Sequence, residues 1–146
     1  MTPSPSALGI VCTDLARSLA FYRALGLESA GVIGTEFEGD ETNPGGAAAM
    51  FHLRKGLILS LYGRSDLAKD ATIPAGPAES GAFSIGHAVA DRDEVDAMLD
   101  RARAAGATVT ADPHDRPWGI YSGYFQDPDG HLWEVMWNPD IDVSRA

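Results

Sequence analysis

Cysteine is nearly absent from this chain of 146 residues, in which Cys12 is the only one. A single thiol forms neither an internal disulfide nor a cysteine-rich zinc site, and it fits the reducing cytoplasm, where we expect the protein to be located. No apolar run approaches the roughly 18 residues of a membrane span, and the N-terminus lacks the basic start and apolar core of a secretory signal. We therefore expect no membrane partner.

Basic residues are also scarce, with 11 Lys and Arg against 21 Asp and Glu, for a net charge of −10. Such a field repels phosphate polymers and attracts small cations, so we expect no nucleic-acid partner. The acidity has a plainer explanation as well, because it keeps a protein soluble. The G-x-G-x-x-G, Walker and G-x-S-x-G patterns are missing, so no motif indicates a dinucleotide, a nucleoside triphosphate or a serine nucleophile.

The hydrophobic pattern that is present predicts the order strand–helix–strand–strand–strand twice. In the first half we expect strands at 7–12, 27–33, 47–53 and 57–62, with a helix between Asp14 and Gly26, and a loop at 34–46. In the second half we expect strands at 82–90, 107–110, 121–126 and 131–137, with a helix between Asp91 and Gly106, and a loop at 112–119. The last two strands flank Asp-Pro-Asp-Gly at 127–130, which favours a type I turn.

The repeated order predicts an α+β fold made of tandem βαβββ modules. We place the modules at about 7–63 and 82–138, with a linker at about 64–81, in a single domain. A unit of about 70 residues is marginal alone, so the modules should share a core. Each mixed sheet buries one face under its helix, and the curved opposite faces are expected to surround a ligand cavity.

Two segments, 13–27 (TDLARSLAFYRALGL) and 118–139 (WGIYSGYFQDPDGHLWEVMWNP), resemble the vicinal oxygen chelate superfamily. This superfamily includes glyoxalase I, extradiol dioxygenases, and the fosfomycin and bleomycin resistance proteins. The resemblance covers essentially the whole chain. It implies the tandem βαβββ fold, a ligand cavity and a homodimer.

The resemblance also implies positions for metal ligands, on the first and last strands of each module. Here these positions hold Ala7, Ser60 (or Tyr62 in a shifted register), Ser84 and Glu134. Only Glu134 is a good ligand, and a catalytic divalent ion needs about three from the protein. We therefore expect no cofactor, with one divalent metal ion in an atypical site as the alternative.

The four histidines do not complete such a set. Strand alternation places His87 with Ile85 and Val89 on the helix side, away from Ser84. We expect His131 to be exposed after the turn and His114 to lie in a polar loop. For His52, which follows Phe51 in a central strand, a ligand pocket and a structural role are equally open.

Aromatic and acidic side chains indicate what the cavity could bind. Pro-Trp-Gly at 117–119 resembles the bleomycin resistance proteins, which bind a large cationic drug without metal catalysis, and Trp118 would offer a stacking surface. The alternative is that Trp118 packs its loop onto the sheet. Parity places Trp133 and Trp137 under the helix and Glu134 in the cavity, where it could act as a base or bind an amine.

We therefore predict a metal-free protein that binds a small or medium organic ligand, with a cationic aromatic compound as one version. The expected ligand-binding residues are Trp118, Glu134, His52, Phe51, Tyr62, Ser60 and Tyr124, with Tyr121 as a further wall candidate. One alternative is a glyoxalase-type lyase or isomerase that uses Glu134 as its catalytic base or as one metal ligand, with His52 as a second ligand or base. Another is a degenerate member that acts only through protein contacts.

Overall fold

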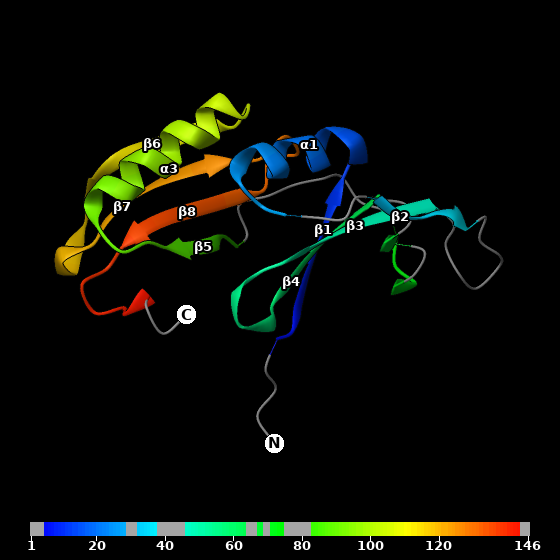
Figure 1. Ribbon diagram of the computed structural model, residues 1–146, viewed down its shortest axis with the longest axis horizontal. Helices are drawn as coiled ribbons and strands as arrows, with labels where there is room; N and C mark the ends of the chain where they lie inside the picture. Colours follow the sequence, from blue (N-terminus) through cyan, green and yellow to red (C-terminus); the bar gives the residue numbers. More distant parts are fainter. Residues whose placement is uncertain are drawn as a thin grey trace, which may run out of the picture. The chain divides into compact units, whose positions relative to one another are not determined.

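The computed structural model describes residues 5–28, 32–37, 46–63, 67–68, 71–74 and 83–143, in two compact units, Met1–Ala78 and Glu79–Ala146. The first unit contains β1 (Ala7–Cys12), α1 (Leu15–Leu25), β2 (Val32–Phe37), β3 (Gly46–His52) and β4 (Ile58–Gly63). The second contains β5 (Ile85–Ala88), α3 (Arg92–Ala104), β6 (Thr108–Asp115), β7 (Tyr121–Gln126) and β8 (Leu132–Trp137). The predicted α+β class is confirmed (Figure 1).

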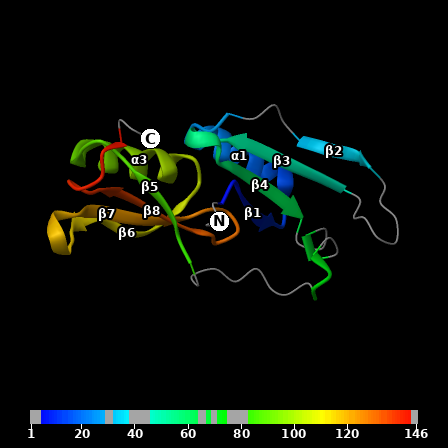
Figure 2. The same ribbon diagram turned by 90° about the horizontal axis from the view of Figure 1, so that it is seen from below.

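Both units use the same sheet topology. The strand orders are β1-β4-β3-β2 and β5-β8-β7-β6, and the order of the first sheet can be followed in Figure 2. The first strand of each unit pairs in parallel with its last strand, and the remaining pairs are antiparallel, so both sheets are mixed. Gly9 pairs with Ser60 in the first sheet as Gly86 pairs with Glu134 in the second. Ser60 is therefore the structural counterpart of Glu134.

The helix boundaries follow from local chemistry that the sequence already shows. The carboxylates of Asp14 and Asp91 accept hydrogen bonds from the backbone N–H groups of Arg17, at 3.0 Å, and Glu94, at 2.9 Å, and so cap α1 and α3. Gly26, with φ 117°, ends α1 in the left-handed region, where glycine has no steric penalty. The sequence offers Thr13 and Asp14 as cap candidates for the first helix and Asp91 and Asp93 for the second, and the structure uses Asp14 and Asp91.

Each helix packs on one face of its own sheet. From α1, Leu19, Tyr22 and Leu25 are buried, and the Tyr22 ring lies 5.7 Å from the ring of Phe51 on β3. From α3, residues Val95, Leu99 and Ala102 are buried, and this helix covers β6, β7 and β8 (Figure 1). In each sheet, the alternate side chains point away from the helix and form what we call the helix-free face.

The turn at 127–130 forms as predicted and explains why the prediction for His131 was wrong. The N–H of Gly130 donates to the carbonyl of Asp127 at 2.9 Å, and Gly130 has φ 85°. The Asp127 carboxylate folds back over the turn and accepts the N–H groups of Asp129, at 2.9 Å, and His131, at 2.8 Å. His131 is consequently only 7% exposed, so the expectation of an exposed histidine was wrong.

Three strands differ from the expected ones by more than one residue at an end. β2 begins at Val32 and takes in part of the expected loop, and residues 29–31 of the expected strand lie outside the described residues. β5 is shorter than expected and begins at Ile85. β6 is longer and runs through Pro113 to Asp115, which the sequence placed in a loop.

The reason for the longer β6 is its place at the sheet edge, where proline is tolerated because one side of the strand needs no partner. The register shifts between Ala111 and His114, and the bulge brings this backbone close to β7 at Gly123. A Cβ at Gly123 would stand 2.8 Å from the Ala111 carbonyl oxygen and 3.1 Å from the Pro113 nitrogen. The glycine is what allows the bulge.

Candidate functional site

Glu134 lies on the helix-free face of the second sheet. In β8, Trp133 and Val135 point toward α3 and are buried, so alternation turns Glu134 and Met136 to the other side. Glu134 pairs with Tyr124 on β7, and such partners share a face at close range. The Glu134 carboxylate is half-buried and has no ion pair or hydrogen-bond partner among the residues that the structure describes.

Ser122 lies on the same face as Tyr124, two residues earlier in β7, and pairs with Met136. It is fully buried, and its hydroxyl has no hydrogen-bond partner in the described part of the chain. Burying a hydroxyl without a partner costs about 1–3 kcal/mol. Sequence reasoning missed Ser122, although its parity with the candidate Tyr124 was a signal that could have identified it.

Arg116 reaches the same aromatic side chain from the connection between β6 and β7. Its guanidinium carbon lies 5.9 Å from the centroid of the Tyr124 ring, within cation–π range. Arg116 is half-buried, and no described carboxylate forms an ion pair with it. Three features therefore lie at or near Tyr124: a carboxylate and a guanidinium that no described residue pairs with, and, two residues away along the strand, a hydroxyl that no described residue bonds.

The turn that follows Arg116 is strained. Trp118 has φ 64° and ψ 23°, a left-handed conformation that is costly for a bulky residue, and Gly119 follows with φ 77°. Trp118 is 85% exposed, so the alternative that it packs its loop onto the sheet is wrong. A strained and exposed aromatic side chain is typical of a functional position.

The helix-free face of the first sheet carries three of the predicted residues. Ser60 pairs with Met50, and Tyr62 and His52 have the same parity as Ser60. Ser60 is buried, Tyr62 is half-buried and His52 is exposed. A Cβ at Gly9 would stand 3.2 Å from the Tyr62 ring, as a Cβ at Gly86 would stand 3.0 Å from the Met136 methyl group. Gly9 and Gly86 occupy equivalent positions, and each makes room for the side chain two residues beyond its ladder partner, Tyr62 in the first sheet and Met136 in the second.

Phe51 must be removed from the candidate site. It has the opposite parity to His52, is 0% exposed and packs against Tyr22 beneath α1. Its role is in the core. His87 is half-buried and shares the α3 side with Val135, its ladder partner, as predicted. Cys12, 3% exposed, is the buried residue that its parity predicted, and its thiol donates to the Tyr62 carbonyl at 3.4 Å.

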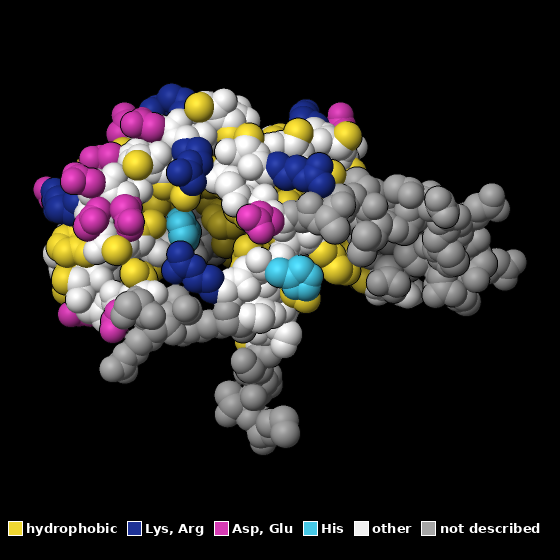
Figure 3. Space-filling view, viewed as in Figure 1, with side chains coloured by type: hydrophobic (Ala, Val, Ile, Leu, Met, Phe, Trp, Pro, Cys, Tyr) yellow, Lys and Arg dark blue, Asp and Glu magenta, His cyan; other side chains and the backbone are white. Residues whose placement is uncertain are grey.

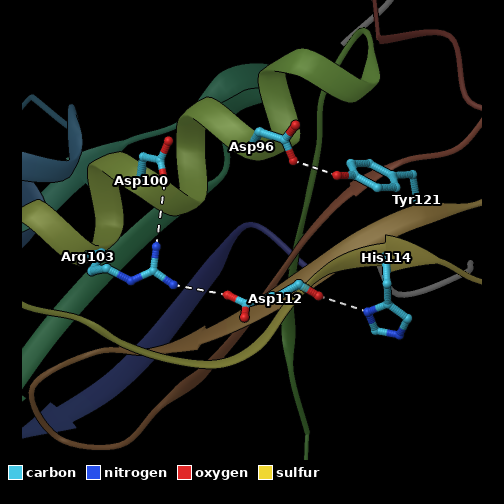
Figure 4. Close-up of polar contacts among 6 residues, drawn as sticks. All are labelled: Asp96, Asp100, Arg103, Asp112, His114 and Tyr121. Carbon is cyan, nitrogen blue, oxygen red and sulfur yellow. Dashed lines mark hydrogen bonds and ion pairs between the residues drawn. The ribbon is translucent and has the colours of Figure 1, made fainter.

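Tyr121 is a further correction, because it faces α3 rather than a ligand. Its hydroxyl donates to Asp96 at 2.6 Å (Figure 4). The Arg92 guanidinium lies 4.1 Å from the centroid of its ring. The bond to Asp96 raises the pKa of Tyr121, and burial raises it further. Arg92 also pairs with Asp115 at 2.7 Å, which lowers the pKa of Asp115 and raises that of Arg92.

These contacts belong to a charged surface over α3, visible as gathered acidic and basic side chains (Figure 3). Arg103 bridges Asp100, at 3.5 Å, and Asp112, at 3.0 Å, and the carbonyl of Asp112 lies 2.8 Å from Nδ1 of His114 (Figure 4). The groups are exposed, so each pair contributes little to stability. They join α3 to the edge strand β6, on the helix side of the second sheet.

The residues at the metal positions of the vicinal oxygen chelate pattern do not fit a divalent ion. Ser60 and Glu134 occupy equivalent ladder positions, whereas Ala7 offers no donor and Ser84 precedes β5 and is exposed. Hydroxyl and methyl groups do not replace the imidazole or carboxylate ligands of a catalytic ion. Among the described residues, no three His, Cys, Asp or Glu side chains are grouped so that they could hold a metal.

Comparison with known proteins identifies the family. A model described as the Glyoxalase/Bleomycin resistance protein/Dioxygenase superfamily matches residues 5–135. The chain belongs to this superfamily. No curated protein matches it. The superfamily's fold explains the duplicated topology, and no described helix is long and apolar enough to cross a membrane.

Solved structures of the superfamily are similar over nearly the whole chain. A glyoxalase-related enzyme from Fulvimarina pelagi is 24% identical, with a TM-score of 0.78, covering 97% of this chain and 94% of its own. Lactoylglutathione lyase from Agrobacterium tumefaciens is 25% identical, with a TM-score of 0.66 and coverages of 94% and 95%. The fosfomycin resistance protein FosX from Listeria monocytogenes is 20% identical, with a TM-score of 0.67 and coverages of 96% and 97%. These likenesses support the fold and leave the activity open.

Proposed function

We propose that the protein binds a small aromatic organic molecule, without a metal ion, on the helix-free face of its second sheet. The observation that carries this proposal is Glu134, a half-buried carboxylate beside Tyr124 with no partner among the described residues. A half-buried carboxylate has lost part of its hydration, so a ligand group that offers a positive charge or a hydrogen-bond donor is favoured beside it. A cationic or hydrogen-bond-donating group of the ligand meets Glu134, and its aromatic plane lies on Tyr124.

The remaining predicted residues have supporting places in this proposal. Trp118 offers an exposed indole for stacking. Ser122 is fully buried, so its hydroxyl can bond a polar group of the ligand, or a bound water, once the atoms that cover it are displaced. In the first unit, His52, Ser60 and Tyr62 share the equivalent helix-free face, and we propose them as contacts of a ligand bound on that face of the first sheet. The net charge of −10 favours the approach of a cation.

Calorimetric titration with benzylamine, an aromatic cation, tests the proposal. Glu134→Gln should weaken binding about tenfold or more, because it removes a charge-assisted hydrogen bond. Tyr124→Leu should weaken it about fivefold through the lost cation–π contact. Glu28→Gln makes the same chemical change at an exposed position and should leave the dissociation constant unchanged. Equal affinity in Glu134→Gln and Glu28→Gln would end the proposal.

The similarity to a lactoylglutathione lyase supports a second candidate, a lyase or isomerase. Here Glu134 would act as a general base, since its carboxylate is free to accept a proton from a substrate near Tyr124. The test is turnover of S-lactoylglutathione by the wild type and Glu134→Gln. Loss of turnover with retained binding would favour the enzyme, and no turnover by the wild type would leave the binding protein.

A further inference from the structure

Arg116 differs from Arg92 and Arg103, the two arginines of α3 that form ion pairs with described carboxylates. Arg92 pairs with Asp115, and Arg103 pairs with Asp100 and Asp112. Arg116 has no carboxylate partner among the described residues, although acidic residues outnumber basic ones 21 to 11. It is also half-buried, so solvent satisfies its five N–H donors only in part.

Arg116 and Glu134 carry opposite charges, and both adjoin Tyr124. The Arg116 guanidinium contacts the Tyr124 ring at 5.9 Å, and Glu134 is the ladder partner of Tyr124. The two charges nevertheless form no ion pair with each other. A half-buried cation and a half-buried anion that both adjoin one aromatic ring without pairing suit a molecule that carries both opposite charges.

We propose that Arg116 is the anion-binding pole of this site, and that the ligand is an aromatic zwitterion. Its carboxylate or similar anion pairs with Arg116, its ammonium group pairs with Glu134, and its ring lies on Tyr124. The planar guanidinium suits a carboxylate because it can donate two parallel hydrogen bonds. This inference rests on the proposed function and narrows its ligand class.

The turn after Arg116 holds this pole in place. The Arg116 N–H donates to the Ile120 carbonyl at 2.7 Å, which closes the segment around the left-handed Trp118 and Gly119. A Cβ at Gly119 would stand 3.6 Å from the Pro139 ring, so the turn also lies against the chain that follows β8. The backbone of Arg116 is thus fixed at one end of the turn that contains Trp118.

The experiment compares three matched probes by calorimetry at low ionic strength: 4-(aminomethyl)benzoate, which is zwitterionic, benzylamine, which is cationic, and 4-methylbenzoate, which is anionic. The zwitterion should bind the wild type about tenfold more tightly than benzylamine, because it gains a charge-assisted pair. Arg116→Gln should remove this gain and leave benzylamine binding within about twofold. Arg101→Gln, which removes an exposed arginine of α3, is the control for net charge and should change neither affinity.

The outcomes separate this inference from the proposal on which it rests. If benzylamine binds through Glu134 while Arg116→Gln leaves the affinity for the zwitterion unchanged, Arg116 is not the anion-binding pole and the proposed function stands. If Arg116→Gln weakens both probes equally, Arg116 acts through Tyr124 and the zwitterion assignment fails. If none of the probes binds at millimolar concentration, both proposals fail. Thermal unfolding of each variant shows that the comparison is made on folded protein.

Discussion

Replacing Ser122 with alanine should make the ligand-free protein more stable. The hydroxyl is fully buried and has no partner among the residues that the structure describes, which costs about 1–3 kcal/mol. Alanine removes this cost without disturbing the β7 backbone. The oxygen makes only a few van der Waals contacts of about 0.1–0.2 kcal/mol each, so little packing is lost. The expected net gain is about 1 kcal/mol in the free energy of unfolding.

Urea denaturation measures this gain directly. With a slope of about 1–3 kcal/mol per molar urea, the midpoint should rise by about 0.3–1 M at unchanged slope. Ser18→Ala is the matched control, because Ser18 is 1% exposed and its hydroxyl is not orphaned. That variant should lose stability by about 0.5–1.5 kcal/mol. If Ser122→Ala loses as much as Ser18→Ala, the Ser122 hydroxyl has a bonding partner and the reasoning is refuted.

Three further changes test the packing, the turn and the charged surface. Gly123→Ala should lose about 1–3 kcal/mol of stability in urea, because its Cβ would meet β6 backbone at 2.8 Å. Gly86→Ala, which meets only the flexible Met136 methyl group, should lose less. Trp118→Gly should keep its stability within about 0.5 kcal/mol or gain, since it relieves the left-handed strain, whereas a packed tryptophan would lose about 3–5 kcal/mol. Arg92 lowers the pKa of Asp115 below its ordinary value of 3.8. The pair therefore stabilises the fold above about pH 4, and this contribution is lost as the pH falls through the lowered pKa of Asp115. Asp115→Asn should therefore narrow the difference between urea midpoints at pH 6 and pH 3, and an unchanged difference would contradict the assignment.

Features that depend on local chemistry were predictable from the sequence. The caps at Asp14 and Asp91 and the turn at 127–130 rely on side chains that bond their own neighbours in the chain. The orientation of Glu134 followed from alternation, because the tryptophans on either side of Val135 fixed the buried parity of β8.

Features that depend on contacts between strands were harder to predict. Pro113 favours a loop in the sequence, and only the strand order shows that it lies in an edge strand, where proline is tolerated. Tyr121 was expected in the cavity wall, and only the structure shows that its hydroxyl donates to Asp96. Phe51 was misassigned because the parity of β3 was unknown before its register with β4. Arg116 was missed because its contact with the Tyr124 ring joins two segments that the sequence does not place side by side.

Glu134 is proposed to bind the ligand without a metal ion. The most direct measurement is calorimetry of 4-(aminomethyl)benzoate with protein treated with EDTA, and again after addition of nickel, zinc or manganese, for the wild type and Glu134→Gln. We predict the same dissociation constant under all of these conditions for the wild type, and a loss of about tenfold or more in Glu134→Gln. Binding that appears only with a divalent ion, or that survives unchanged in Glu134→Gln, would contradict the account.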